Sequence, residues 1–248
     1  MATIAQWDIN NECNLNCKHC RVSEKNDNEK LSLREAKNLL AEFWYNGITM
    51  LNLSGGEPCL RSDIFEILDY AKNFEDIVIT TNGTLLNDEK CQKLASYENI
   101  KLSISLDGLE ETHDKFRRTK GAFKKVIDIL PILNKYNIKY AIKYTLSKET
   151  AKDANELLKL VANLGATEFN VRRVIVAGNA SKDMVLANEE YKKVIKDLIQ
   201  NCRKLNVKFR TGDPLLIPIF SEVWGIDIKK SKATLPVSIE ESVIQIAY

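Results

Sequence analysis

The chain has 248 residues, 44% of them apolar, and its 36 basic and 34 acidic side chains give a formal net charge of +2. This length and apolar content suit one α/β domain with a full core, and so small a net charge argues against nucleic-acid binding. Residues 1–7 lack the basic flank and apolar segment of a secretory signal, and no stretch approaches the roughly 18 apolar residues of a membrane span. We therefore expect a cytoplasmic protein without a membrane or nucleic-acid partner.

Short runs rich in β-forming residues alternate along the chain with longer helical patterns. The predicted strands are 3–9, 49–53, 77–81, 101–106, 139–146 and 168–176. The predicted helices are 32–46, 62–73, 87–95, 122–136, 152–163 and 188–204. The first helix has a capping-box pattern at Ser32 and Glu35, and Gly47 suits its end.

Strands and helices that alternate at this spacing predict parallel strands joined by right-handed crossovers. An open sheet and a partial or full barrel both fit this pattern. In either case, binding groups gather at the carboxyl ends of the strands. Four segments rich in reactive or turn-forming residues follow the first four strands in order, at 13–20, 55–57, 82–83 and 107–108. We therefore expect one face of the molecule to carry the chemistry.

The alternation weakens from Gly212 onward. Pro214 and Pro218 lie close together and exclude a regular helix between them, whereas the run 243–248 is apolar and favours β-structure. We expect residues 1–211 to form the α/β domain. Residues 212–248 are expected to form a tail that packs on it as an edge strand or cap, not a separate domain.

Three of the six cysteines, Cys13, Cys17 and Cys20, lie within eight residues, directly after the first predicted strand. In a chain without a secretory signal, this spacing indicates metal or redox chemistry and not a disulfide framework. Three thiolates can hold three irons of a four-iron cluster and leave the fourth iron open to a ligand. Zinc is the alternative, with His19 as a further ligand, but adjacent His19 and Cys20 fit poorly into one tetrahedron with both other thiolates.

A second signal, Ser54-Gly-Gly-Glu-Pro58, follows the second predicted strand. Paired glycines let the backbone approach a ligand closely, and the adjacent Glu57 carboxylate can accept hydrogen bonds from a ligand ammonium group. A Gly-Gly pair alone is more often an ordinary turn. Here the cysteine triplet follows the preceding strand, and the two segments together indicate a binding site.

The cysteine spacing and the Gly-Gly-Glu-Pro sequence at 55–58 together resemble the radical S-adenosylmethionine (SAM) superfamily. Further segments resemble its branch of peptide maturases, sulfatase-maturing enzymes and molybdopterin-type cyclases, and they lie at 80–83, 105–108, 113–117 and 121–123. The resemblance covers about residues 3–220. It implies a partial (β/α)6 TIM-type barrel with one [4Fe-4S] cluster, which reductively cleaves SAM to methionine and a 5′-deoxyadenosyl radical that abstracts hydrogen from a substrate carbon.

The resemblance also implies roles for individual residues. The iron ligands would be Cys13, Cys17 and Cys20, with SAM chelating the open iron. The residues that would bind SAM are His19, Gly55, Gly56, Glu57, Ser105 and Arg117. The Gly-Gly-Glu turn would hold the methionine ammonium, Ser105 the carboxylate or ribose, and Arg117 the carboxylate. His19 stands where the family usually has an aromatic side chain near adenine.

Several side chains fit two interpretations. Lys143, Thr145 and Arg173 lie toward the ends of predicted strands, so they either contact substrate or SAM or are polar members of a half-buried strand face. The segment 115–145 holds nine Lys or Arg residues and one acid, Asp128. It is either a solvated helix face or a basic rim for an anionic substrate or acidic peptide.

The other cysteines are scattered singly, so we expect one cluster. Longer peptide-maturing relatives carry a cysteine-rich extension called SPASM or twitch, and the chain is either a minimal enzyme or a fragment that ends before it. Cys59, beside the Gly-Gly-Glu-Pro motif, is the candidate for a catalytic hydrogen-atom donor, whereas Cys91 and Cys202 are expected to be buried in helices.

Modification of a ribosomally made peptide or protein is the first functional hypothesis. The alternatives are a cofactor-biosynthesis enzyme that acts on a small molecule and a noncatalytic cluster-binding barrel subunit. In the catalytic readings, a reductase such as flavodoxin or ferredoxin would supply the electron.

Overall fold

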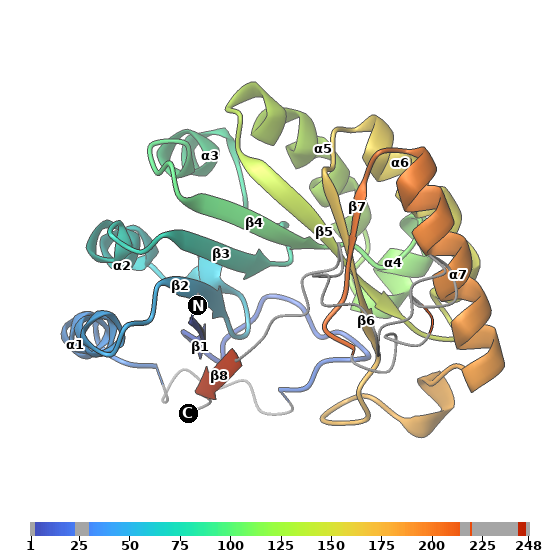
Figure 1. The fold of residues 1–248 in the computed structure, drawn as a ribbon, viewed down its shortest axis with the longest axis horizontal. Helices are drawn as coiled ribbons and strands as arrows, with labels where there is room; N and C mark the ends of the chain where they lie inside the picture. Colours follow the sequence, from blue (N-terminus) through green and yellow to red (C-terminus); the bar gives the residue numbers. More distant parts are fainter. Residues whose placement is uncertain (1–2, 23–29, 214–218, 220–242, 247–248) are drawn as a thin grey trace, which may run out of the picture.

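The computed structural model describes residues 3–22, 30–213, 219 and 243–246. These residues form one sheet of eight strands in the order β7-β6-β5-β4-β3-β2-β1-β8, and every pairing is parallel (Figure 1). The strands are β1 (Ile4–Asp8), β2 (Met50–Ser54), β3 (Asp76–Thr81), β4 (Ile100–Ser105), β5 (Lys139–Leu146), β6 (Glu168–Arg173), β7 (Lys208–Arg210) and β8 (Val243–Ile246). The predicted α/β fold with a partial barrel of parallel strands is confirmed.

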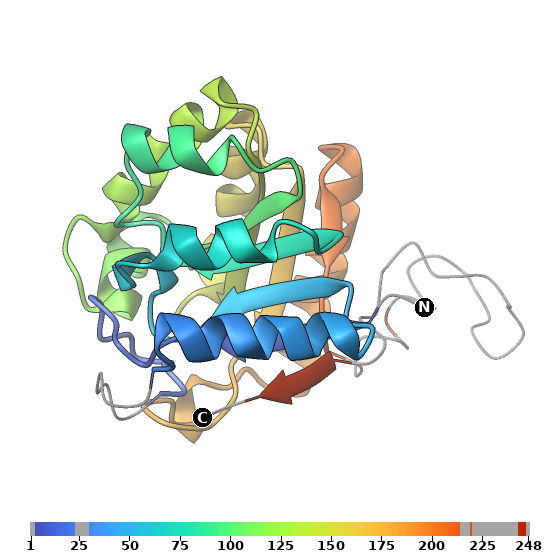
Figure 2. The same ribbon diagram turned by 90° about the vertical axis from the view of Figure 1, so that its left-hand side faces the viewer.

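Helices connect the strands and form an outer arc around the sheet (Figures 1 and 2). They are α1 (Leu33–Tyr45), α2 (Ile64–Ala71), α3 (Asp88–Leu94), α4 (Glu110–Arg117), α5 (Ala122–Lys135), α6 (Ala154–Asn163) and α7 (Asn188–Lys204). Short 3-10 turns occur at Pro58–Leu60, Ala151–Asp153 and Lys182–Met184. The predicted capping box of α1 is present, because the Glu35 N–H donates to Ser32 Oγ and the Ser32 N–H donates to the Glu35 carboxylate.

Alternation along the strands separates the core from the site. In β2, Leu51 and Leu53 are buried in the core, whereas Asn52 and Ser54 line a cavity on the inner face of the sheet. In β5, Ile142 belongs to the core and Lys143 lines the same cavity. Because successive side chains of a strand point to opposite faces, apolar residues pack under the helices while polar ones face inward.

Two elements differ from the sequence-based expectation. The prediction missed α4, a short helix whose eight residues are mostly charged or polar, and β7, which has only three residues. The run predicted to favour β-structure near the end contains β8, which pairs with β1. The division of the chain at residues 211 and 212 stays a prediction, because 214–218 and 220–242 lie outside the described residues.

Within the described part of the chain, no helix combines the length and the apolar character that crossing a bilayer requires.

Candidate active site

A cavity of about 600 Å³ lies at the carboxyl ends of β1 to β6. Its wall includes all three cysteines of the triplet, both glycines of the Gly-Gly turn, and Ser105 at the end of β4. Residues predicted to bind a cluster and SAM, which are far apart in sequence, thus face one space.

The loop that carries the cysteines is fixed to the Gly-Gly turn by backbone hydrogen bonds. The Gly56 N–H donates to Asn10 O at 2.8 Å, and the Glu57 N–H donates to Glu12 O at 2.7 Å. A Cβ atom on Gly55 would lie 2.2 Å from Asn10 O, and one on Gly56 would lie 2.1 Å from Glu12 O. Glycine is therefore required at both positions because the cysteine loop packs directly on this turn.

The three cysteine side chains suit a cluster better than a single ion. Among the described residues, no three His, Cys, Asp or Glu side chains are grouped closely enough to hold one metal ion, although all three triplet cysteines line the cavity. A zinc ion needs every sulfur about 2.3 Å from one point, whereas a four-iron cluster offers a separate iron to each thiolate. The donor set therefore fits a [4Fe-4S] cluster with Cys13, Cys17 and Cys20 as ligands.

Behind the cysteines lies a buried ion pair between Asp107, which follows β4, and Arg117, the last residue of α4. Arg117 Nε donates to Asp107 Oδ2 at 2.7 Å, and the Thr145 N–H donates to the other oxygen at 2.6 Å. Burial alone would raise the pKa of Asp107, but the Arg117 charge holds it below its ordinary value. His113 bridges the same turn, because its Nδ1 accepts from the Asp107 N–H.

His19 lies in the cavity wall with its ring stacked on Phe116, at a centroid distance of 4.4 Å and an interplanar angle of 10°. Burial and the nearby Arg117 charge lower the pKa of His19 to about 4, so the imidazole is neutral at pH 7. Its Nδ1 is buried without a hydrogen-bond partner among the described residues. A neutral ring with an unused polar atom fits the predicted contact with adenine.

The structure places Glu57 differently from the prediction. Its carboxylate is fully buried and is not part of the cavity wall. It accepts hydrogen bonds from the Cys59 N–H, the Thr81 hydroxyl and the Asn82 N–H. The Glu57 side chain therefore ties the ends of β2 and β3 together, and Gly55 and Gly56 are the members of this motif that reach the cavity.

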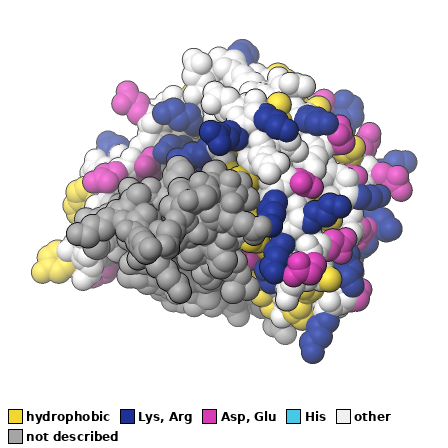
Figure 3. All heavy atoms as spheres, turned by 45° about the vertical axis from the view of Figure 1, so that its right-hand side comes forward, with side chains coloured by type: hydrophobic (Ala, Val, Ile, Leu, Met, Phe, Trp, Pro, Cys, Tyr) yellow, Lys and Arg dark blue, Asp and Glu magenta, His cyan; other side chains and the backbone are white. Residues whose placement is uncertain are grey.

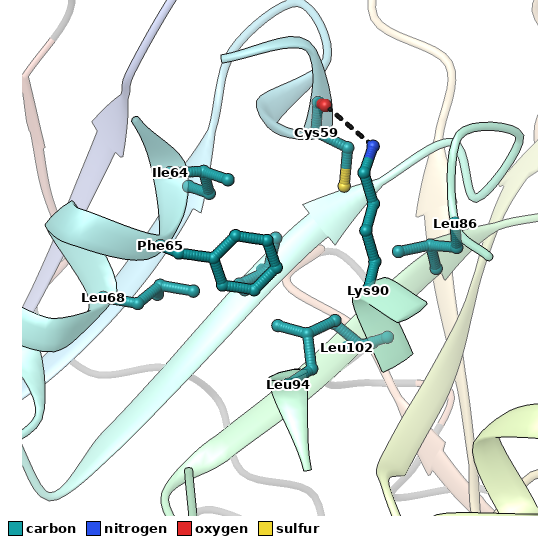
Figure 4. Close-up of a pocket in the computed structure, with 9 residues that line it drawn as sticks. Cys59, Ile64, Phe65, Leu68, Leu86, Lys90, Leu94 and Leu102 are labelled. Carbon is teal, nitrogen blue, oxygen red and sulfur yellow. Dashed lines mark hydrogen bonds between the residues drawn. The ribbon is translucent and has the colours of Figure 1, made fainter. Parts of the chain in front are cut away.

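Cys59 also lies away from the cavity. It borders a separate apolar space of about 20 Å³ between α2 and α3, next to Phe65 and Leu102 (Figure 4). Burial there raises the pKa of the Cys59 thiol above its ordinary value. A hydrogen-atom donor must reach the substrate radical, so this position argues against the catalytic role predicted for Cys59.

Replacing Cys59 with Ala is therefore expected to leave two quantities unchanged: the rate of SAM cleavage and the extent of the reaction on the substrate. The sulfur lies 3.8 Å from Thr81 Oγ1 and also contacts the Glu57 carboxylate, and both partners have other hydrogen bonds, so its removal should cost only modest packing stability. Single-turnover formation of 5′-deoxyadenosine measures the first effect, with thermal unfolding as the stability control. A variant that folds but stalls after SAM cleavage would restore the donor role.

Lys143, Thr145 and Arg173 all reach the cavity wall, so the structure favours their functional reading over simple strand alternation. Lys143 pairs in register with Ser105 across β4 and β5. Burial and the charges of Arg172 and Arg21 lower the pKa of Lys143 from 10.5 to about 8.

Sequence reasoning missed several charged residues of this wall, among them Asp8 and Arg21. Asp8 is the last residue of β1, and burial raises its pKa although the nearby Arg21 charge opposes this. Arg21 directly follows the last cysteine of the triplet. The alternation of side chains in β1 could have identified Asp8. Trp7 is buried on one face of the strand, so the next side chain, that of Asp8, must lie on the other face.

The basic segment 115–145 is not a continuous rim. Lys115 lies 3.6 Å from Glu149, Lys124 pairs with Asp128, and Lys135 pairs with Asp88. These ion pairs favour a solvated helix face over a docking site for an anion at Lys115, Lys124 and Lys135. On the face of the molecule drawn in Figure 3, Lys and Arg side chains are likewise interspersed with acidic ones.

Comparison with known proteins agrees with this geometry. The family model described as the Radical SAM superfamily matches residues 7–161. The chain is 34% identical over 193 residues to an AdoMet-dependent heme synthase of Methanosarcina barkeri, which covers 76% of this chain and 55% of that protein. It is 32% identical over 164 residues to the mycofactocin maturase MftC of Mycolicibacterium smegmatis, which covers 65% of this chain and 42% of that protein.

Among solved structures, Streptococcus suis SuiB bound to precursor peptide SuiA matches with a TM-score of 0.79 and 19% identity, over 90% of this chain and 52% of SuiB. That likeness shows the partial-barrel fold. The chain spans about half the length of the curated relatives it matches. The segment matched by the family model includes the cysteine triplet, the Gly-Gly turn and Ser105. The chain therefore belongs to the Radical SAM superfamily, whose members use a [4Fe-4S] cluster and SAM.

Proposed function

We propose that this chain forms the catalytic barrel of an enzyme that cleaves SAM reductively at one [4Fe-4S] cluster and abstracts hydrogen from a carbon of an anionic substrate. The observation that carries this proposal is the convergence of the cysteine triplet, the Gly-Gly turn, Ser105 and His19 on one cavity. A reductase such as flavodoxin or ferredoxin is expected to supply the electron.

The chain's own residues would hold and orient the reactants. When bound, the cluster and SAM supply a 5′-deoxyadenosyl radical as the hydrogen-abstracting species. Cys13, Cys17 and Cys20 would hold the iron, and the Ser105 hydroxyl could donate to the SAM carboxylate. The neutral His19 ring, fixed by its stack on Phe116, offers a flat surface to adenine.

The charges of the cavity wall indicate the chemistry of the substrate. Arg117 and Arg173 are paired with Asp107 and Asp213. The wall also contains the cations Arg21 and Lys143 and the acid Asp8. Cations thus outnumber acids where the substrate must lie, and this field favours a negatively charged group.

Two substrate classes meet this requirement. Our first hypothesis is a peptide or protein made on the ribosome, which would present an Asp or Glu carboxylate to the wall. Its support is the similarity to MftC, named a maturase, and to the fold of SuiB, solved with a precursor peptide. The second is a small molecule of cofactor biosynthesis, supported by the similarity to a heme synthase. Haem-type rings carry propionate groups that would meet the same cations.

Transfer of deuterium can decide between these classes. The anaerobic, reduced protein would be incubated with SAM and either a deuterated acidic peptide or a deuterated iron porphyrin that bears propionates. We expect one probe to accelerate SAM cleavage and to place deuterium in 5′-deoxyadenosine, and we expect its methyl ester to be inactive. Equal activity of the ester would contradict an anionic substrate.

Lys143→Met should weaken binding of the active probe about tenfold, or about 1.4 kcal/mol, because a cation in the cavity wall is lost. Lys139→Met is the matched control, since Lys139 begins the same strand but is exposed. The concentration of probe for half-maximal 5′-deoxyadenosine formation measures the effect. Equal loss in both variants would contradict a specific role for Lys143.

The same lysine predicts a pH dependence. With its pKa lowered to about 8, Lys143 should attract an anionic probe below pH 8 and lose this attraction above it. The wild-type affinity should therefore fall through pH 8, while Lys143→Met stays flat. Stability has the opposite sign, because the unfolded chain binds more protons between pH 8 and 10.5, so this group's contribution rises with pH in that window.

A further inference from the structure

The C-terminal end of α4 contacts the cysteine loop through two consecutive residues. Phe116 O accepts a hydrogen bond from the Lys18 N–H at 2.9 Å, and the Phe116 ring stacks on His19. The next residue, Arg117, places Nη1 3.7 Å from Cys17 Sγ, within the range of an N–H···S hydrogen bond. Helix α4 contains no predicted iron ligand, yet its last residue contacts Cys17, which is a predicted iron ligand.

The direction of the Arg117 side chain is fixed from behind. Asp107 is 0% exposed and Arg117 is 7% exposed, and Asp107 Oδ2 accepts from Arg117 Nε at 2.7 Å. The other Asp107 oxygen accepts from the Thr145 N–H on β5. Because the carboxylate is held on the far side of the guanidinium, the opposite edge of the planar fork faces Cys17.

The contact at Cys17 has a different character from the contacts at its neighbours. Cys13 Sγ accepts from the Leu15 N–H at 3.4 Å, which is a neutral donor. Cys20 Sγ lies 3.3 Å from the Val22 carbonyl. At Cys17 the donor carries a full positive charge in a buried place, where solvent screens it little.

We propose that Arg117 is a positioning residue that raises the reduction potential of the cluster through its hydrogen bond to the Cys17 sulfur, with Asp107 fixing its direction and moderating its charge. A cluster gains negative charge when it is reduced, so a cationic N–H donor at a ligand sulfur stabilises the reduced form. A higher potential eases transfer of the first electron from an external reductase. This inference rests on the cluster proposed above.

The midpoint potential of the reconstituted cluster, measured by EPR-monitored titration without SAM, tests this directly. Arg117→Met should lower the potential enough to reduce the ratio of reduced to oxidised cluster about tenfold at a fixed potential, which is about 59 mV for one electron. Arg117→Lys should recover part of the shift, because it restores the charge without the planar fork. Lys18→Met is the control, since it removes a cation from the cysteine loop that pairs with Glu149.

Asp107→Asn gives a second, opposite signature. It leaves one acceptor oxygen, which can serve Arg117 at the expense of the Thr145 N–H, and it removes the negative charge, so the potential should rise above that of the wild type. A purely structural role for this pair would not move the potential in opposite directions in the two variants. Equal potentials in Arg117→Met and wild type, or shifts of the same sign in the Arg117 and Asp107 variants, would overturn the inference.

The possible outcomes of these measurements can be told apart. If Arg117→Met fails to retain iron, Arg117→Lys and Asp107→Asn still give the sign of the effect. If the wild type assembles no cluster, the proposed function fails. If the cluster assembles but its potential ignores Arg117, the proposed function stands and only this inference falls.

Discussion

Gly56→Ala is expected to prevent the cysteine loop from assembling a cluster. The added Cβ would lie 2.1 Å from Glu12 O, a backbone atom one residue before Cys13. Backbone cannot rotate aside as a side chain can, so the loop must move away from the turn and lose the hydrogen bonds at Gly56 and Glu57. We expect a stability loss of about 1–3 kcal/mol, typical of overpacking, and little bound iron after anaerobic reconstitution.

The matched control for Gly56→Ala is Gly121→Ala. Gly121 has a φ of +79°, but a Cβ there would meet nothing within 4 Å. This control therefore strains the backbone without disturbing the cysteine loop. Iron analysis and thermal unfolding of both variants separate the two effects. If Gly56→Ala retained as much iron as Gly121→Ala, the packing of the loop on the turn would not be needed for the site.

Cys17→Ala is expected to abolish both cluster binding and SAM cleavage. Cys17 is the middle cysteine of the triplet in the sequence. It is buried, lines the cavity and is contacted by Arg117. Two remaining thiolates cannot hold three irons, so the visible absorption of the cluster should be lost. The effect should appear in iron and sulfide content as well as in 5′-deoxyadenosine formation.

Cys202→Ala is the control for Cys17→Ala. Cys202 is also buried, but it lies in α7 as part of the hydrophobic core. Its loss should lower stability slightly through the small cavity created and should leave the iron content intact. Comparable iron in Cys17→Ala and Cys202→Ala would show that the triplet is not the cluster site.

Local sequence pattern predicted most of the fold because each strand and each longer helix buries apolar residues with its own period. α4 escaped because its only buried members are Thr112, His113, Phe116 and Arg117, and three of these are polar or charged. Their burial depends on Asp107 and the cysteine loop, which lie elsewhere in the chain. Helix propensity and periodicity carry no information about such partners.

Most of the residues predicted for the site line one cavity, whereas Glu57 and Cys59 do not. Cys13, Cys17, Cys20 and Ser105 reach the cavity because each follows or ends a parallel strand. Glu57 and Cys59 belong to a neighbouring motif, yet their side chains turn away from the cavity. Motif spacing fixes where the backbone runs, whereas the side to which a loop residue points depends on the hydrogen bonds that its neighbours offer.

Reduction of the anaerobically reconstituted protein in the presence of SAM tests the central claim most directly. The wild type should bind about four irons and four sulfides per chain, and after reduction it should release methionine and 5′-deoxyadenosine. A protein that binds zinc in place of iron, or that assembles the cluster and leaves SAM intact after reduction, would contradict the account.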